Sequence, residues 1–78
     1  MTIKYIQLQG CAEELHDNGE RTVHPATKEA VEFFGIYKGE PGDFVNVADA
    51  YEYGDALLIA NLLAAHYGAQ LMNDVEAP

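Results

Sequence analysis

The sequence predicts an α+β fold, in which a small three-stranded antiparallel sheet packs against one main C-terminal helix. Three observations predict this architecture. The segment Thr2–Gln9 alternates in the manner of a strand, and two further strand-like segments, Glu32–Lys38 and Phe44–Ala50, flank a Pro-Gly turn. A long apolar segment with helical spacing, residues 55–71, follows them. Strands that precede a single helix favour a helix packed across one face of the sheet.

The first strand is predicted from the alternation of its side chains. Lys4, Ile6 and Leu8 fall on one face of Thr2–Gln9, and the residues between them fall on the other. This pattern is typical of a strand with one buried face. We therefore predict a strand over Thr2–Gln9.

The stretch after the first strand carries two weaker signals. The pair Asn18-Gly19 favours a tight turn, because both residues readily take positive φ angles. Leu15 and Val23 would then flank a short hairpin, and an irregular loop is the alternative. Thr27–Ala30 is predicted as one extra short helical turn, since a threonine can cap a helix.

The second hairpin is predicted from its turn. Residues 40–43, EPGD, place Pro and Gly at the two central positions of a type II turn. On the strand before the turn, Phe34 and Ile36 are expected to face the helix. Val45 and Val47 are expected to meet them from the strand after it.

The helix carries no charged face. Its larger apolar side chains share one arc of a helical wheel, and this arc is expected to pack on the sheet. The opposite arc is small and uncharged, which favours contact with a second helix in a homo-oligomer, although alanine is also a good helix former in water. The residues expected in the core are Leu58, Ile59, Leu62, Leu63 and Tyr67, and the expected oligomer interface is Ala56, Leu57, Ala60, Asn61 and Ala64.

The ends of the helix follow from their side chains. Asp55 is expected to stabilise the first turn, because a carboxylate there accepts from free backbone N–H groups. Gly68 is expected to end or weaken the helix, with Ala69–Met72 as a frayed turn. Residues 1–72 are predicted to form one domain, and residues 73–78 are predicted to be a disordered tail.

Charge is the most unusual property of the chain. Thirteen acidic and four basic residues give a net charge of −9, and no Lys or Arg follows Lys38. Such a chain is expected to bind neither nucleic acid nor an anionic membrane directly, but to attract a basic protein surface. The lone Cys11 excludes an internal disulfide, and the first residues show no signal-peptide pattern, so a cytoplasmic location is predicted.

No catalytic or metal-binding motif is recognisable. The spacing of Cys11, His16 and His24 matches no familiar zinc pattern, and the chain lacks serine altogether. His66 falls within the expected core arc, where it would be either a proton-transfer group or a buried side chain with a satisfied hydrogen bond. The sequence therefore predicts a protein that is not an enzyme and uses no metal or cofactor. The alternative is a metal-dependent or small-molecule enzyme that uses His66 and nearby carboxylates.

An acidic ridge runs from the second hairpin into the helix, with tyrosines beside it. Its carboxylates could take the place of nucleic-acid phosphates in a groove lined by Arg and Lys. The alternative is a solvated surface that keeps a small protein soluble. The predicted partner-binding residues are Glu40, Asp43, Asp49, Tyr51, Glu52, Tyr53 and Asp55.

Residues 33–68, FFGIYKGEPGDFVNVADAYEYGDALLIANLLAAHYG, resemble a pattern found in many small acidic phage and plasmid proteins. The pattern is an aromatic strand, a Pro/Gly turn, a second strand ending near Ala-Asp, and an Asp-Ala-Leu helix ending in Tyr-Gly. Proteins of this kind include anti-CRISPR and other host-defence inhibitors. The resemblance implies a DNA-mimicking inhibitor that blocks the nucleic-acid surface of a host protein, and it transfers no individual site residue.

Overall fold

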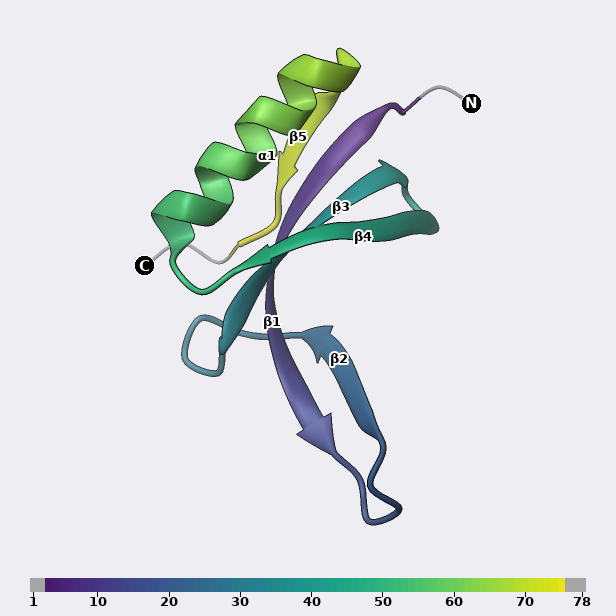
Figure 1. Ribbon diagram of the computed structural model, residues 1–78, viewed down its shortest axis with the longest axis vertical. Helices are drawn as coiled ribbons and strands as arrows, with labels where there is room; N and C mark the ends of the chain where they lie inside the picture. The colour runs from purple at the N-terminus through teal and green to yellow at the C-terminus, as the bar shows by residue number, and fades with distance from the viewer. Residues whose placement is uncertain (1–2, 76–78) are drawn as a thin grey trace.

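The computed structural model describes residues 3–75 and has an α+β architecture (Figure 1). Within those residues, a five-stranded and mainly antiparallel sheet is covered on one face by a single helix. The predicted α+β class is confirmed, whereas the predicted number of three strands is wrong. The elements in chain order are β1 (Tyr5–Leu15), β2 (Arg21–Pro25), β3 (Phe33–Glu40), β4 (Asp43–Ala50), α1 (Tyr53–Tyr67) and β5 (Gln70–Asn73).

Strand β1 is the centre of the sheet. On one edge it pairs antiparallel with β3, from Tyr5 opposite Gly39 to Cys11 opposite Phe33. Its other edge is shared, because β5 runs parallel to the first half of β1 and β2 runs antiparallel to the second half. Strand β4 pairs with β3 and forms an outer edge of the sheet.

Both predicted hairpins form, and each turn uses a glycine with positive φ. Gly19 has a φ of 86° in the β1–β2 turn, where the side chain of Asn18 accepts a hydrogen bond from the Glu20 amide at 3.0 Å. Gly42 has a φ of 89° in the β3–β4 turn. The hairpin is therefore the correct alternative for the region around Asn18. The extra helical turn at Thr27–Ala30 is only a hydrogen-bonded turn, closed by a 2.9 Å bond from the Ala30 amide to the Thr27 carbonyl.

The core lies between the helix and the part of the sheet formed by the first half of β1 and the neighbouring β3. Ile6 and Leu8 of β1 and Ile36 of β3 are fully buried there, beneath Ala56 and Ala60 of α1. Alanine side chains let the helix backbone approach the sheet closely, so that the larger strand residues fill the space between the two layers. Complete burial of an isoleucine or leucine side chain contributes roughly 1.5–3 kcal/mol, so these three strand residues dominate the core.

The helix is rotated relative to the expected orientation: Ile59 and Leu63 pack against the core as predicted, whereas Leu58 and Leu62 of the expected core arc face away from it. Ala56 and Ala60 are 0% exposed, whereas Leu58 and Leu62 are 60% and 62% exposed. The larger side chains on both sides of Ala56 and Ala60 explain this orientation. Leu57 on one side, and Ile59 and Leu63 on the other, are partly buried and pack against the core. The expected interface through Ala56 and Ala60 is thus wrong, because these residues lie inside the molecule.

An irregularity in β4 changes which of its side chains reach the core. The register between β3 and β4 shifts at Ile36/Tyr37, so that Ile36 lies opposite Ala48 and Tyr37 lies opposite Asn46. The shift leaves Val47 unpaired, as in a β-bulge, and turns Ala48 toward the helix. The expected inward positions of Val45 and Val47 are corrected, since both side chains are exposed.

The chain continues in order beyond the helix. Gly68 ends α1 with a φ of 64°, as predicted, and the Ala69 amide donates to the Ala64 carbonyl at 2.9 Å. The expected frayed turn at Ala69–Met72 is wrong, because Gln70–Asn73 forms β5 beside β1. Asp74 follows with its amide bonded to the Leu8 carbonyl at 2.8 Å. Of the tail predicted at 73–78, residues 76–78 lie outside the described residues.

Candidate partner-binding site

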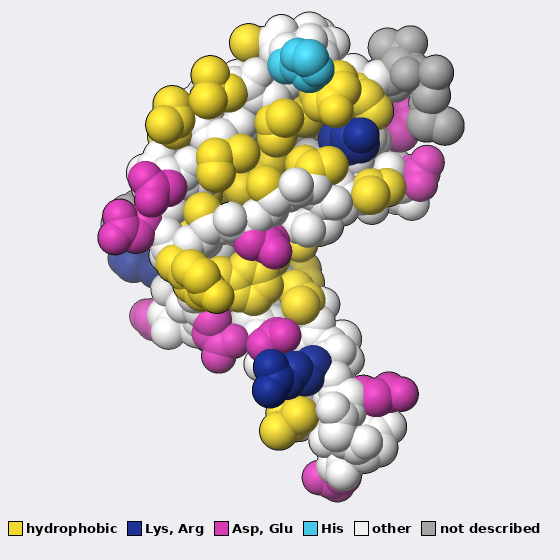
Figure 2. All heavy atoms as spheres, in the orientation of Figure 1, with side chains coloured by type: hydrophobic (Ala, Val, Ile, Leu, Met, Phe, Trp, Pro, Cys, Tyr) yellow, Lys and Arg dark blue, Asp and Glu magenta, His cyan; other side chains and the backbone are white. Residues whose placement is uncertain are grey.

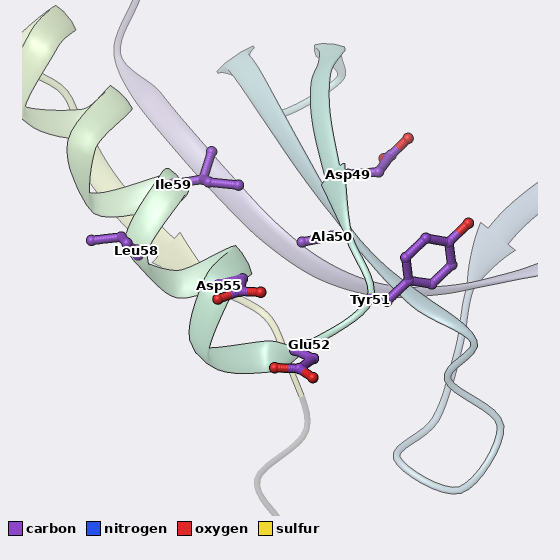
Figure 3. Close-up of a pocket in the computed structure, with 7 residues that line it drawn as sticks. All are labelled: Asp49, Ala50, Tyr51, Glu52, Asp55, Leu58 and Ile59. Carbon is purple, nitrogen blue, oxygen red and sulfur yellow. The ribbon is translucent and has the colours of Figure 1, made fainter.

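The acidic residues at the junction of β4 and α1 surround one hollow of about 600 Å³ (Figure 3). Asp49 comes from β4, Glu52 precedes the helix, and Asp55 lies in its first turn. Tyr51 stands between them and is 86% exposed. Ala50, Leu58 and Ile59 give the hollow an apolar part. The residues that line it are Asp49, Ala50, Tyr51, Glu52, Asp55, Leu58 and Ile59, and none is a Lys or Arg.

The start of α1 determines where two of the carboxylates lie. Glu52 is the N-cap residue and has extended backbone angles, but its side chain makes no capping hydrogen bond. Its carboxylate is therefore free to meet an external group. Asp55 lies at the third helical position, close to the positive end of the helix dipole, which favours a negative charge there.

Asp49 links this hollow to a groove on the sheet face that the helix leaves uncovered. Its carboxylate accepts a 3.0 Å hydrogen bond from the side chain of Asn46, which holds it at the β4 edge. It also lines two further hollows, of about 350 and 300 Å³, together with Val23 and Phe33. Figure 3 shows Asp49 and Tyr51 on the side of the β4–α1 connection away from the helix. The acidic site thus extends around the edge of the sheet.

The groove contains residues that the sequence did not assign to the site. Tyr37 lies at its centre, and its hydroxyl is 3.4 Å from the Sγ of the buried Cys11. Burial, followed by the hydrogen bond to Cys11, raises the pKa of Tyr37 above its ordinary value, so this phenol stays protonated and can donate. The alternation of β3 and β4 was the available signal, because it places Phe33, Tyr37 and Asn46 on the face away from the helix.

The two acids of the β3–β4 turn do not belong to this cluster. Asp49 lies six positions after Asp43 along β4, which corresponds to about 20 Å of extended strand. Glu40 is also partly neutralised, because its Oε2 lies 3.3 Å from the Nζ of Lys4. The predicted ridge is therefore two separate acidic surfaces, and the carboxylates at the β4–α1 junction line a hollow together with apolar side chains.

Tyr53, the second predicted anchor, holds the helix in place. Its ring packs edge-on against Phe34 with 5.6 Å between centroids, and its hydroxyl accepts a 2.8 Å hydrogen bond from Asn73. These contacts connect the start of α1 to β3 and β5. Tyr51 is thus the tyrosine of this pair whose ring is available to a partner.

No protein-family model, curated protein or solved structure matches this chain.

The histidines lie apart from this site. His16 is 2.7 Å from the hydroxyl of Thr22 in the β1–β2 hairpin, and His24 lies in β2. His66 is exposed at the end of α1 and packs against Tyr67, which corrects its expected position in the core arc. Among residues 3–75, no three His, Cys, Asp or Glu side chains converge as a metal site. The same part of the chain has no helix of the length and apolarity needed to cross a membrane.

Proposed function

We propose that this protein is a non-enzymatic inhibitor that binds a basic nucleic-acid-binding surface of a partner protein. One observation carries the proposal: three carboxylates and an exposed tyrosine surround a single hollow whose lining contains no Lys or Arg. An Arg or Lys side chain of a partner would meet Asp49, Glu52 and Asp55 there without competition from a neighbouring cation. Charge-assisted hydrogen bonds of this kind are stronger than neutral ones.

The composition of the site suits a basic partner in two ways. The net charge of −9 attracts a positive surface over a distance and speeds association. The hollow then supplies short-range contacts, because Tyr51 and the apolar side chains of Leu58 and Ile59 can cover the stem of an arginine. The chain would thereby occupy positions that phosphates take on the partner, as a DNA mimic does.

The biological setting is the finer part of the proposal. The resemblance of residues 33–68 to small phage and plasmid proteins favours an anti-CRISPR-type inhibitor that acts in the cytoplasm of a host cell. The second function considered, a structural homo-oligomer packed through the alanine face, loses its interface because Ala56 and Ala60 are buried.

A titration with a short arginine-rich peptide tests the site directly. Amide chemical shifts are expected to change most at residues 49–55 and little at Asp43, and the affinity is expected to fall steeply with added salt. A peptide of the same length with Glu in place of Arg serves as the control for non-electrostatic binding. Shifts spread evenly over all acidic residues would contradict a defined site.

Two variants with equal charge separate the site from the total charge. Asp49→Lys with Glu52→Lys and Asp17→Lys with Asp43→Lys each add four charges, which changes the net charge from −9 to −5. The first pair is expected to weaken peptide binding at least about tenfold, and the second pair much less. Equal losses would show that total charge alone drives binding, and the proposal would fail.

The cellular partner can be sought by affinity capture from the host. The captured protein is expected to bind nucleic acid, and the wild-type chain is expected to displace that nucleic acid in a competition assay. The variant with Lys at positions 49 and 52 should leave the nucleic acid bound. A captured protein that binds nucleic acid equally well with and without the wild-type chain would count against inhibition.

A further inference from the structure

The outer face of α1 is apolar and uncovered. Leu58 and Leu62 lie one helical turn apart, and each is about three-fifths exposed, at 60% and 62%. Figure 2 shows hydrophobic side chains gathered over the helix at the upper left of the molecule. Asn61 and Ala65 are also exposed on this side, so we call Leu58, Asn61, Leu62 and Ala65 the outer stripe.

The outer stripe is an uncharged surface on a strongly acidic protein. Between Asp55 and His66 the helix contains no titratable side chain. Two copies of a chain with a net charge of −9 repel each other over most of their surfaces. Along the outer stripe they can meet without bringing carboxylates together.

The ends of the helix provide complementary hydrogen-bonding groups for such a meeting, because an imidazole N–H can donate to a carboxylate. Asp55 and His66 lie on the same flank of the outer stripe, near opposite ends of α1. In an antiparallel pair with a two-fold axis between Ala60 and Asn61, the Asp55 carboxylate of each copy lies beside His66 of the other. The antiparallel arrangement also sets the helix dipoles in opposite directions.

We propose that a second copy of this chain covers the outer stripe, as a symmetric antiparallel dimer through α1. Such a contact is isologous, because the same surface serves both copies. Its area is small: a helix of 15 residues is about 22 Å long, and the stripe offers less than the roughly 800 Å² per partner of a standard interface. The Kd is therefore expected in the micromolar range.

The dimer does not depend on the proposed inhibitory function. The outer stripe and the hollow share Leu58, and Asp55 also lines the hollow, whereas Leu62 and Ala65 belong to the outer stripe alone. Loss of self-association with retained peptide binding, or the reverse, distinguishes the two proposals.

Sedimentation equilibrium on the full chain tests the dimer. The wild type is expected to approach twice the 8.6 kDa mass of one chain as its concentration rises to roughly 100 µM, well above the expected Kd. Leu62→Glu with Ala65→Glu, which leaves the lining of the hollow unchanged, should remain a monomer throughout. Both side chains are already exposed, so circular dichroism should show an unchanged fold.

Leu15→Glu with Val23→Glu is the matched control. It introduces the same charges at exposed apolar residues of the β1–β2 hairpin and is expected to dimerise like the wild type. A wild type that stays monomeric over the whole range overturns the proposal and leaves the outer stripe to a different partner. A Leu62/Ala65 variant that still dimerises places the interface elsewhere and also overturns it.

A charge exchange tests the antiparallel arrangement. Asp55→Lys or His66→Asp alone is expected to weaken the dimer roughly two- to fivefold, the size typical of an exposed charge pair. The double variant places the lysine at position 55 of one copy beside position 66 of the other, where Asp replaces His66, and this ion pair should restore most of the affinity. A double variant weaker than either single variant would rule out the antiparallel pair.

Discussion

The orientation of α1 can be tested by an exchange of size between two of its residues. Ala60 is fully buried against the sheet, whereas Leu58 is mostly exposed. Ala60→Leu would insert extra carbon atoms between the helix and Ile6, Leu8 and Ile36. Leu58→Ala would remove a side chain that faces solvent. Ala60→Leu should therefore destabilise the fold more than Leu58→Ala does. A core packed through the leucine side of the helix would give the reverse order.

The structure sets the size of each effect. Overpacking of a close helix–sheet contact costs about 1–3 kcal/mol, which we expect for Ala60→Leu. Full burial of a leucine is worth roughly 1.5–3 kcal/mol, and Leu58 is 60% exposed, so Leu58→Ala should cost about 1 kcal/mol or less. For a chain of 78 residues, the total free energy of unfolding is roughly 4–12 kcal/mol. Ala60→Leu should thus remove a readily measured share of it.

Urea unfolding followed by circular dichroism measures both effects. Ala65→Leu is the matched control, because it makes the same exchange at an exposed position of the same helix and so cancels the difference in helix propensity. Measurements at two protein concentrations separate folding from self-association through Leu58. A Leu58→Ala variant that loses 3 kcal/mol while Ala60→Leu is neutral would refute the orientation of the helix.

Two further results follow from the pKa of Tyr37 and from the β3–β4 turn. Because folding raises the pKa of Tyr37, the native state holds this proton more tightly than the unfolded state. The contribution of Tyr37 to the free energy of unfolding should therefore be constant below pH ~10 and fall above it. Urea midpoints across alkaline pH check this, and an equally steep fall in Tyr37→Phe would contradict it. Gly39→Ala should destabilise the fold by more than ~1 kcal/mol, because its φ is 134° and a Cβ there would collide with the Asp43 carbonyl. Gly42→Ala, with positive φ but open space around it, should cost less in the same unfolding assay, and equal costs would show that the collision is relieved.

Local signals in the sequence predicted where helices and strands lie better than they predicted which of these elements contact each other. The Asn-Gly and Pro-Gly pairs predicted both hairpins, because a turn depends on the backbone preferences of a few adjacent residues. The face of α1 could not be chosen in this way, since a helix without a charged side has no periodicity that separates inside from outside. Strand β5 was missed for a related reason: its partner, β1, lies more than sixty residues earlier in the chain.

The candidate site was predictable only where its residues are close in sequence. Asp49, Glu52 and Asp55 lie three residues apart across a strand end and a helix start, so their proximity follows from the sequence. Glu40 and Asp43 were grouped with them wrongly, because an extended strand carries its two ends far apart. The groove around Tyr37 depends on how β2 lies relative to β3 and β4, which no short segment specifies.

The shared edge of β1 divides that single strand into two regions of different burial. Its first half lies between β3 and β5 beneath the helix, whereas Glu13–Leu15 and all of β2 are exposed. Local opening of the β1–β2 hairpin would uncover little apolar surface, so its amides should exchange with solvent far faster than those of Ile6 and Leu8. The hairpin can therefore open and close as an independent unit while the rest of the sheet stays folded. Substitutions at Glu13–Leu15 or in β2 should then alter the motion of this hairpin with little effect on global stability.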